Sequence, residues 1–257
     1  MIHPRAVVDP AADISDSVEI GPYSIIGPGV TIGDHTWIGP HVVVNGPTNI
    51  GADNKIYQFA SIGDAPQHVN YKNEPTRLII GDRNTIREYV TVNRGTVAGG
   101  ELTRIGSDNL LMAYSHIAHD CVVMDHTIFA NGASLAGHVD VGDYAILGGF
   151  TLVHQHCSIG AHSITAINTV VFKDIPPYVV ASGYGADPHG INTTGLKRRD
   201  FPDEVIDILK DAYKTIFRSG LNTEEALASL APKAEKYTEI AELIRFIANS
   251  ERGIIRA

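Results

Sequence analysis

The chain has 257 residues, of which 44% are hydrophobic and 19% are charged, and its formal net charge is −9. This length and composition allow a substantial buried core, and the negative charge argues against nucleic acid as a main partner. The sequence has no signal peptide and no apolar run of about 18 residues, so we expect a cytoplasmic protein without stable membrane insertion.

Hydrophobic residues recur at every sixth position through most of the chain. One series runs over 8–62, a second over 80–92 and a third over 105–171, and together they make 25 hexads. The residue at this position is aliphatic in all of them except Phe129 and Thr165. Because a period of six fits neither a helix nor simple strand alternation, it predicts a solenoid whose coils repeat short strands and turns.

The other positions of the hexad indicate the shape of each coil. Two residues before the aliphatic position the side chain is usually small or β-branched, and a strand directs both side chains inward. This pattern suits a narrow coil with three faces, about 18 residues per turn and about eight coils. Glycine often follows the aliphatic residue, where we expect it to ease the bend between faces. Cys121 and Cys157 occupy the small inward position, so we expect buried thiols rather than a disulfide or a nucleophile.

Two segments interrupt the hexads. Residues 64–78 keep the phase but would direct His68 and Glu74 inward, so they predict an outward loop. Residues 94–104 break the phase, because the aliphatic positions on either side are 13 residues apart. Excursions from a rigid scaffold are common places for functional sites.

The repeat stops at residues 174–177, and from about residue 202 the spacing of hydrophobic residues becomes helical. We expect three helices, of which the second opens with a capping box at Asn222 and Glu225 and the third closes at Gly253. They are too small to fold alone and should pack on the coil or on a neighbouring subunit. The fold class is therefore mainly β, with a parallel β-helix over 1–190 and an α-helical domain over 191–257.

Candidate chemistry concentrates in the histidines of the third series. His119 and His138 are 19 residues apart at corners of the coil, so they should lie nearly stacked on successive coils. Asp120 directly follows His119, and a neighbouring carboxylate can orient an imidazole and raise its basicity. The alternative for each of these histidines is an ordinary solvent-exposed position with no function. A second alternative is a zinc site formed by three histidines between chains, although no three histidines are singled out as ligands by their spacing.

Several motifs extend over the whole chain and resemble one family, the UDP-N-acetylglucosamine O-acyltransferases of lipid A biosynthesis. They are the runs at 58–63, 74–77, 81–84, 94–96, 109–121, 135–138, 153–155 and 192–199. The resemblance implies a homotrimer of left-handed β-helices with active sites in the clefts between subunits. It also implies an acyl carrier protein as the donor and a UDP-amino sugar as the acceptor, with no metal and no cofactor.

The resemblance further implies the roles of individual residues. His119 would take the proton from the sugar 3-hydroxyl as it attacks an (R)-3-hydroxyacyl thioester, and Asp120 would orient His119. The N–H of Gly137 would receive the developing oxyanion. The implied substrate-binding residues are Gln67, His68, Asn70, Asn93, His116, His138, His154, Gln155, Ile167, Asn192, Thr194, Arg198 and Arg199. In this set Asn192, Arg198 and Arg199 would bind the nucleotide, and the basic run 197–199 would attract the acidic carrier.

The chain departs from the family pattern on the substrate side. His68 and Asn70 stand where the family commonly has aspartate and lysine, Asn93 replaces a histidine, Thr194 a glutamate and His156 an aromatic residue. These departures leave two interpretations open. One is drift within the O-acyltransferases, and the other is altered acceptor recognition, such as N-acylation of a 3-amino UDP-sugar.

One position bears on the acyl donor. Ile167 stands where a bulky residue shortens the acyl chain in the family, so we expect a chain of about ten to twelve carbons. A donor such as acetyl-coenzyme A is an alternative, against which the 192–199 motif and Ile167 argue. A trimeric binding scaffold without catalysis is a further alternative, against which the intact His119–Asp120 pair argues.

Overall fold

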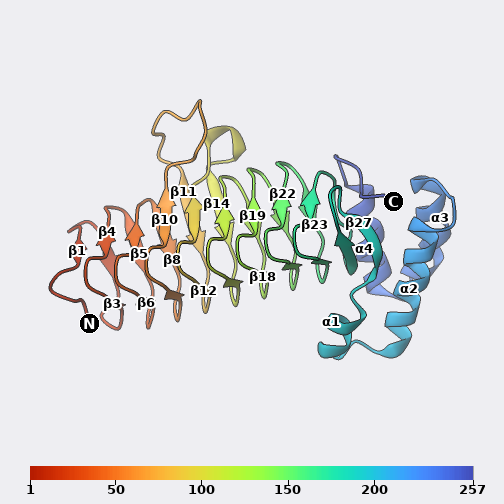
Figure 1. Ribbon diagram of the computed structural model, residues 1–257, viewed down its shortest axis with the longest axis horizontal. Coiled ribbons are helices and arrows are strands. Elements are labelled where there is room, and N and C mark those ends of the chain that lie inside the picture. The colour runs from red at the N-terminus through yellow and green to blue at the C-terminus, as the bar shows by residue number, and fades with distance from the viewer. Residues whose placement is uncertain (257) are drawn as a thin grey trace.

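The computed structural model describes residues 1–256 and shows a long parallel β-helix with a small helical domain at its carboxyl-terminal end (Figure 1). Three sheets of nine, eight and ten short strands form the three faces. In an uninterrupted coil, paired residues are 18 apart, as Val7 opposite Ile25 illustrates. The predicted hexapeptide β-helix is therefore confirmed, and its coils are left-handed.

Strands β1 to β26 pair in parallel with strands of neighbouring coils. The first face contains β1 (Val7–Val8), β4 (Ile25–Ile26), β7 (Val43–Val44), β10 (Ser61–Asp64), β13 (Thr91–Asn93), β16 (His116–Ile117), β19 (Ser134–Leu135), β22 (Leu152–Val153) and β25 (Val170–Val171). The second face contains β2 (Asp13–Ile14), β5 (Val30–Ile32), β8 (Thr48–Ile50), β11 (Arg77–Ile80), β14 (Leu102–Ile105), β17 (Val122–Val123), β20 (Asp140–Val141) and β23 (Ser158–Ile159). The third face contains β3 (Glu19–Ile20), β6 (Trp37–Ile38), β9 (Lys55–Ile56), β12 (Thr85–Ile86), β15 (Leu110–Leu111), β18 (Ile128–Phe129), β21 (Ile146–Leu147), β24 (Ile164–Thr165), β26 (Val179–Ser182) and β27 (Asp187–Ile191).

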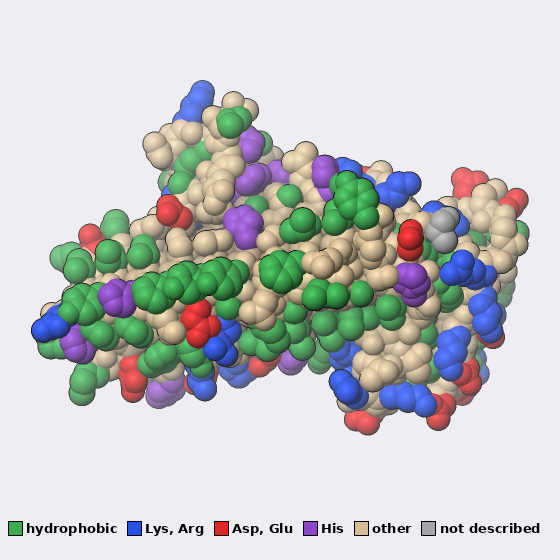
Figure 2. All heavy atoms as spheres, in the orientation of Figure 1, with side chains coloured by type: hydrophobic (Ala, Val, Ile, Leu, Met, Phe, Trp, Pro, Cys, Tyr) green, Lys and Arg blue, Asp and Glu red, His purple; other side chains and the backbone are tan. Residues whose placement is uncertain are grey.

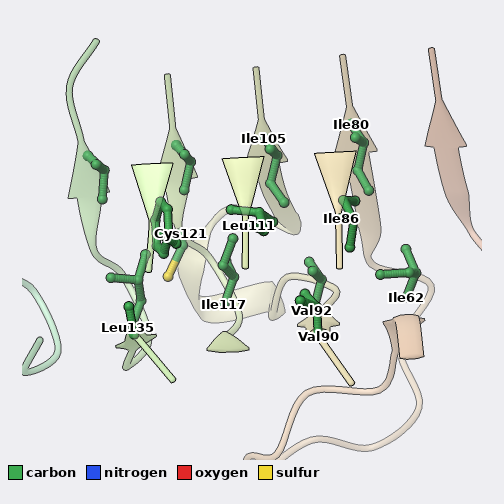
Figure 3. Packing of buried hydrophobic residues seen from close by; sticks show 14 of the residues in the cluster. Ile62, Ile80, Ile86, Val90, Val92, Ile105, Leu111, Ile117, Cys121 and Leu135 are labelled. Carbon is green, nitrogen blue, oxygen red and sulfur yellow. The ribbon is translucent and has the colours of Figure 1, made fainter. Parts of the chain in front are cut away.

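The hexad residues point into the coil and form one continuous hydrophobic core (Figure 3). Ile62, Ile80 and Ile86 come from the three different faces and are all buried in the interior. Each such side chain contributes about 1.5–3 kcal/mol through its burial. The core is thus one continuous cluster built from the same contacts repeated coil after coil, which explains why the period alone predicts the fold.

Polar and sulfur-containing residues in the interior are also accounted for. The buried Asn84 side chain donates from Nδ2 to Oδ1 of Asn54 on the preceding coil at 3.0 Å, and its own Oδ1 accepts from the backbone N–H of Asn109 on the next coil at 3.0 Å. Cys121 and Cys157 are buried free thiols, as expected, and burial raises the pKa of Cys121 to about 12. A thiol with such a pKa is a core filler and not a nucleophile at neutral pH.

The expected role of the glycine after the aliphatic residue was wrong. The left-handed backbone conformation at the corners belongs to the third residue after the aliphatic one, for example Tyr23 with φ 63° and His41 with φ 56°. The glycine instead lies against the next coil, since a Cβ on Gly21 would be 2.7 Å from the backbone nitrogen of Pro40. At Gly21, Gly33 and Gly51 the glycine is required for close packing of successive coils, while residues such as Tyr23 and His41 make the bend.

The two excursions leave the same corner of the coil and project from it together (Figure 1). They are shorter than the expected 64–78 and 94–104, because β11 starts at Arg77 and β14 starts at Leu102. These two strands pair in register over four residues each, which draws the ends of both loops into the second face. The remaining segments are 65–76 and 94–101, and the second contains a 3₁₀ turn, η1 (Val97–Gly99).

The coil continues beyond the expected stop at 174–177, because β26 pairs with β24 in the third face and β27 returns antiparallel to β26. Four helices follow instead of three: α1 (Thr193–Arg198), α2 (Asp203–Phe217), α3 (Thr223–Ala234) and α4 (Thr238–Ala248). The capping box of Asn222 and Glu225 at the start of α3 is confirmed. Within residues 1–256, no helix has the length and apolar character needed to cross a bilayer.

The expectation that Gly253 closes the last helix was wrong, since α4 ends at Ala248 with Asn249 as its C-cap. The residues after it cross the end of the coil, where Asp174 forms a β-bridge with Ile254. Ile255 joins the core of the coil, and Tyr213 and Phe217 of α2 pack against that core. The helical domain therefore folds back on the coil of its own chain, which is one of the two arrangements expected.

Candidate active site

The pair His119 and Asp120 lies at the corner from which both excursions project. It directly follows β16 on the first face, and Asp120 turns the corner with φ 60°. His138 takes the equivalent corner of the next coil, where its N–H donates to the carbonyl oxygen of His119 at 3.1 Å. The two imidazole centroids are 5.2 Å apart with an interplanar angle of 86°, so the residues are neighbours on successive coils, as expected, but their rings meet edge-on. Figure 2 shows histidine side chains gathered beside the projecting segments.

The geometry of the pair fixes the imidazole of His119. Its Nδ1 is 2.8 Å from Oδ2 of Asp120, whose side chain is completely buried, while 12% of the His119 side chain is exposed. An ionised carboxylate only accepts hydrogen bonds, so Nδ1 carries the proton. The lone pair of Nε2 is then available to accept a proton from a bound hydroxyl or amino group.

The backbone of Gly137 lies against the ring of His119. A Cβ at this position would be 2.5 Å from Cε1 and 2.9 Å from Nε2 of His119, so the ring occupies the space that a larger residue would fill. Within residues 1–256, the N–H of Gly137 donates to no protein acceptor. A free backbone donor beside an imidazole base is the arrangement that stabilises an oxyanion during acyl transfer.

Other imidazoles surround the pair. His68 comes from the 65–76 segment and packs edge-on against His119, with the centroids 5.2 Å apart. His116 Nδ1 is 2.7 Å from Oγ1 of Thr91, and burial, followed by the neighbouring His119, lowers the pKa of His116. Burial also lowers the pKa of His138. Near neutral pH the rings of His116 and His138 are therefore neutral groups that can donate or accept hydrogen bonds beside the base.

A metal is the alternative use of such a cluster. His119, Asp120 and His138 offer ligand atoms within 4.8 Å of one another. The Asp120 carboxylate, however, already accepts hydrogen bonds from Nδ1 of His119 and from both N–H and Oγ1 of Thr96. With its lone pairs committed in this way, the geometry favours a hydrogen-bonded dyad over a metal centre.

The remaining predicted residues of the 65–76 segment and the coil differ in their exposure to solvent. Gln67 and Asn70 are exposed on the segment beside His68. Asn93 is only 4% exposed, and its Nδ2 donates to the carbonyl oxygen of Ala65 at 2.9 Å. Asn93 therefore supports the segment from beneath instead of facing the open surface. His154 and Gln155 are exposed at the end of β22, beyond the coil of His138. Within residues 1–256, no hydrogen bond or ring contact joins them to His119.

The structure of one chain does not bring the predicted nucleotide residues to this corner. Arg199 lies at the corner between the second and third faces, with its guanidinium 4.9 Å from the ring centroid of Tyr144. Asn192 is buried as the N-cap of α1 and donates to the carbonyl oxygen of His162. Thr194 and Arg198 are exposed on the same short helix.

Ile167 lies at the third corner, between the third and first faces, and is 66% exposed. The predicted set is thus distributed over all three corners of the coil. A single chain assembles the base and its surroundings, while the predicted nucleotide and acyl-chain positions lie elsewhere on its surface.

Two residues at the site were not predicted to act there. Thr96 is 5% exposed and contacts both carboxylate oxygens of Asp120. His156 stacks on His138 with the centroids 4.4 Å apart. Thr96 belongs to the motif at 94–96, but because the hexad phase is broken there, the spacing did not predict that Thr96 contacts Asp120. His156 follows His138 by 18 residues, so the coil repeat could have identified that contact.

Comparisons with known proteins place the chain in a family. The family model described as "Udp N-acetylglucosamine O-acyltransferase; Domain 2" matches residues 174–255, and the bacterial transferase hexapeptide model matches residues 102–137. An acyl-[acyl-carrier-protein]–UDP-N-acetylglucosamine O-acyltransferase of Thiobacillus denitrificans is 61% identical over 99% of this chain and 99% of its own length. The chain belongs to this O-acyltransferase family.

Further members of the O-acyltransferase family match in sequence and in structure. A relative from Janthinobacterium is 57% identical over 100% of this chain and 99% of its own. The solved UDP-N-acetylglucosamine acyltransferase of Francisella novicida superposes with a TM-score of 0.98 at 41% identity, over 100% of this chain and 94% of that chain. The enzyme LpxA of Acinetobacter baumannii gives a TM-score of 0.96 at 47% identity, over 99% of both chains.

Proposed function

We propose that this protein transfers an (R)-3-hydroxyacyl chain from acyl carrier protein to the 3-hydroxyl of UDP-N-acetylglucosamine, the first step of lipid A biosynthesis. Its family membership supports the reaction class and both substrates. The single observation that carries the chemistry is the geometry at His119. The Asp120 carboxylate holds Nδ1 at 2.8 Å, and the free N–H of Gly137 lies beside the same ring.

The proposed reaction is an acyl transfer with His119 as the general base. Its Nε2 takes the proton of the sugar hydroxyl while the hydroxyl oxygen attacks the thioester carbonyl carbon. The carbonyl oxygen becomes negatively charged and accepts a hydrogen bond from the Gly137 N–H, a contact worth roughly 2.7–4 kcal/mol in comparable sites. The C–S bond then breaks, and the imidazolium returns the proton to the leaving thiolate of the carrier. The proposed transfer uses neither a metal nor a cofactor.

The enzyme is proposed to act as a homotrimer. An aromatic row, formed by Tyr23, His41, Phe59, Tyr89 and Tyr114, stacks along the corner between the third and first faces with centroids 4.9 to 5.3 Å apart. Its tyrosine and phenylalanine residues are 45% to 62% exposed, and Figure 2 shows hydrophobic side chains in a long row over the coil. A continuous exposed aromatic surface of this kind is typical of a subunit interface.

The trimer would also complete the site. If the aromatic rows of three coils meet, the first face of one protomer lies opposite the third face of the next. The His119 corner of one chain then approaches the partner corner that carries Arg199, so base and nucleotide residues share one cleft. The exposed Lys197 and Arg198 nearby suit the acidic carrier protein. A cytoplasmic location follows from this carrier and nucleotide chemistry.

A second acceptor is favoured by one observation. His68 contacts the His119 ring, and the resemblance described above implies an aspartate at this position in the family. A histidine in place of an aspartate beside His119 changes the charge near the base. Such a change can alter which nucleophile is accepted, so N-acylation of a 3-amino UDP-sugar is the alternative reaction. The same base and oxyanion donor would serve it.

The test offers UDP-N-acetylglucosamine and its 3-amino analogue side by side with one 3-hydroxyacyl carrier protein. Ester formed from the hydroxyl sugar supports the O-acyltransferase proposal, and product from the amino sugar alone would replace it with N-acylation. The variant His119→Ala should lose about 10²- to 10⁴-fold in kcat. As a matched control, His35→Asn changes an exposed corner histidine remote from the site and should leave turnover unchanged. Unchanged turnover in His119→Ala would contradict the proposed base.

A further inference from the structure

The Asp120 carboxylate is held by a residue from outside its own coil. Its Oδ1 accepts from the N–H of Thr96 at 2.7 Å, and its Oδ2 accepts from Oγ1 of Thr96 at 2.6 Å. The same Oδ2 contacts Nδ1 of His119 at 2.8 Å. The Asp120 side chain has no exposed surface, so these protein donors replace the water that would otherwise solvate the carboxylate.

The direction of the Thr96 hydroxyl proton follows from its other partner. Thr96 is the N-cap of η1, and its Oγ1 accepts from the N–H of Gly99 at 3.2 Å. Since an N–H occupies one lone pair of Oγ1, the hydroxyl proton is free to point at Asp120. The turn is built tightly against the carboxylate, because a Cβ on Gly99 would be 2.0 Å from Cγ of Asp120.

We propose that Thr96 is a positioning residue of the acyl transfer: its two hydrogen bonds fix the Asp120 carboxylate so that His119 presents Nε2 to the acceptor. This inference rests on the proposed role of His119 as the base. This role gives the second excursion, residues 94–101, a function, since the break in the hexad phase places Thr96 over the corner of the next coil. Thr96 acts through Asp120 and touches neither the imidazole nor the acceptor.

Thr96→Val removes the hydroxyl but keeps the shape and the backbone N–H. The carboxylate then keeps one anchor, and the imidazole loses its fixed orientation. We expect kcat to fall about 10- to 100-fold, while KM for the UDP-sugar changes by less than about twofold because Thr96 is buried away from the surface.

The pH profile separates this role from a structural one. A carboxylate that loses a donor attracts the imidazolium proton more strongly, so the acid limb of kcat/KM should move to higher pH by about half a unit to one unit. The other titratable groups that face His119 are His68 from the first excursion, His116 on β16 and His138 on the next coil. Thr96→Val alters none of them.

Three further variants complete the test. Thr96→Ser restores the hydroxyl and should recover most of the lost kcat. Gly99→Ala forces the carboxylate aside with Thr96 intact, so it should lower kcat even if Thr96→Val folds poorly. Thr36→Val removes a buried hydroxyl that donates to Gly51 and accepts from Asn54 on a remote coil. It should lower thermal stability comparably while leaving kcat and the pH profile unchanged.

The outcomes distinguish this inference from the proposed function. If His119→Ala is inactive while Thr96→Val and Gly99→Ala keep full kcat, the positioning role is wrong and the base assignment stands. An unshifted pH profile with equal losses in Thr96→Val and Thr96→Ser would also overturn it. If His119→Ala retains turnover, the proposed base itself fails.

Discussion

The imidazole of His119 rests directly on the backbone of Gly137, one coil further along the chain. A Cβ added to Gly137 would approach His119 Cε1 to 2.5 Å, although ordinary contacts of a Cβ exceed 3.4 Å. The glycine therefore has two effects at once, since it leaves room for the base and leaves its own N–H free for an oxyanion.

Gly137→Ala should displace the imidazole and disturb the oxyanion donor while the coil remains folded. We expect kcat to fall by about 10²- to 10³-fold, the loss seen when one oxyanion donor is removed. Steady-state kinetics with a 3-hydroxyacyl carrier protein measure it, and Gly27→Ala on a remote coil serves as the control because a Cβ there has no contact closer than 3.4 Å. Full activity in Gly137→Ala would show that neither the ring position nor this N–H matters.

Acid should destabilise the protein through His162. Burial, followed by the nearby Arg199, lowers the pKa of His162 to about 4. Between about pH 6.5 and 4 the unfolded chain binds a proton at this histidine and the folded chain does not, so stability is lost as the pH falls through this window. Because the ring is only partly buried, we expect a loss of about 1–2 kcal/mol from this group.

The variant His162→Phe tests that window. The ring stacks between Tyr144 and Tyr178, and its buried Nδ1 has no hydrogen-bond partner within residues 1–256, so phenylalanine should be accommodated. Urea unfolding at pH 7 and pH 4.5 should show a smaller loss of unfolding free energy in the variant. An identical loss in both proteins would assign the acid sensitivity to other groups.

The donor chain length should depend on Ile167. This residue is 66% exposed at the corner that carries the aromatic row, so its branched side chain can contact an acyl chain in an intersubunit groove. We expect the protein to prefer chains of about ten to twelve carbons, and Ile167→Gly to move the preference to longer chains. Transfer rates over a series of 3-hydroxyacyl donors measure both. A wild-type preference for fourteen carbons over ten would refute the assignment.

A charged residue introduced into the aromatic row should dissociate the proposed trimer. Tyr89 and Tyr114 stack with an interplanar angle of 1° and are 45% and 62% exposed. Tyr89→Asp would require an interface to bury an unpaired carboxylate, which is strongly unfavourable. Light scattering after size exclusion should report monomers, and activity should fall with them. Thr31→Asp, an exposed position of β5 on the second face outside the proposed interface, is the control for an added charge. A trimeric, active Tyr89→Asp would locate the interface elsewhere.

The extent to which the sequence predicted the site depends on the coil repeat. His119 and Asp120 are adjacent in the chain, and His138 follows by 19 residues, so their proximity could be read from the period. His68 and Thr96 reach the same corner from excursions that leave the repeat, and no spacing rule connects them to Asp120. The role of Gly21 and its equivalents was misread because a contact between coils does not differ, in the sequence, from a bend within one.

The sequence by itself determined the β-helix, because every hexad repeats the same inward residue and each coil needs only its neighbours to bury its core. It also determined the family and the identity of the candidate base. Only the tertiary structure decided how the base is supported, since the two excursions fold back through contacts such as Thr96 with Asp120 that no periodicity encodes. It likewise decided that the coil extends to β26 and β27 and that the chain end crosses the last coil beside Asp174. Those arrangements depend on hydrogen bonds and packing between residues distant in sequence, which local spacing does not specify.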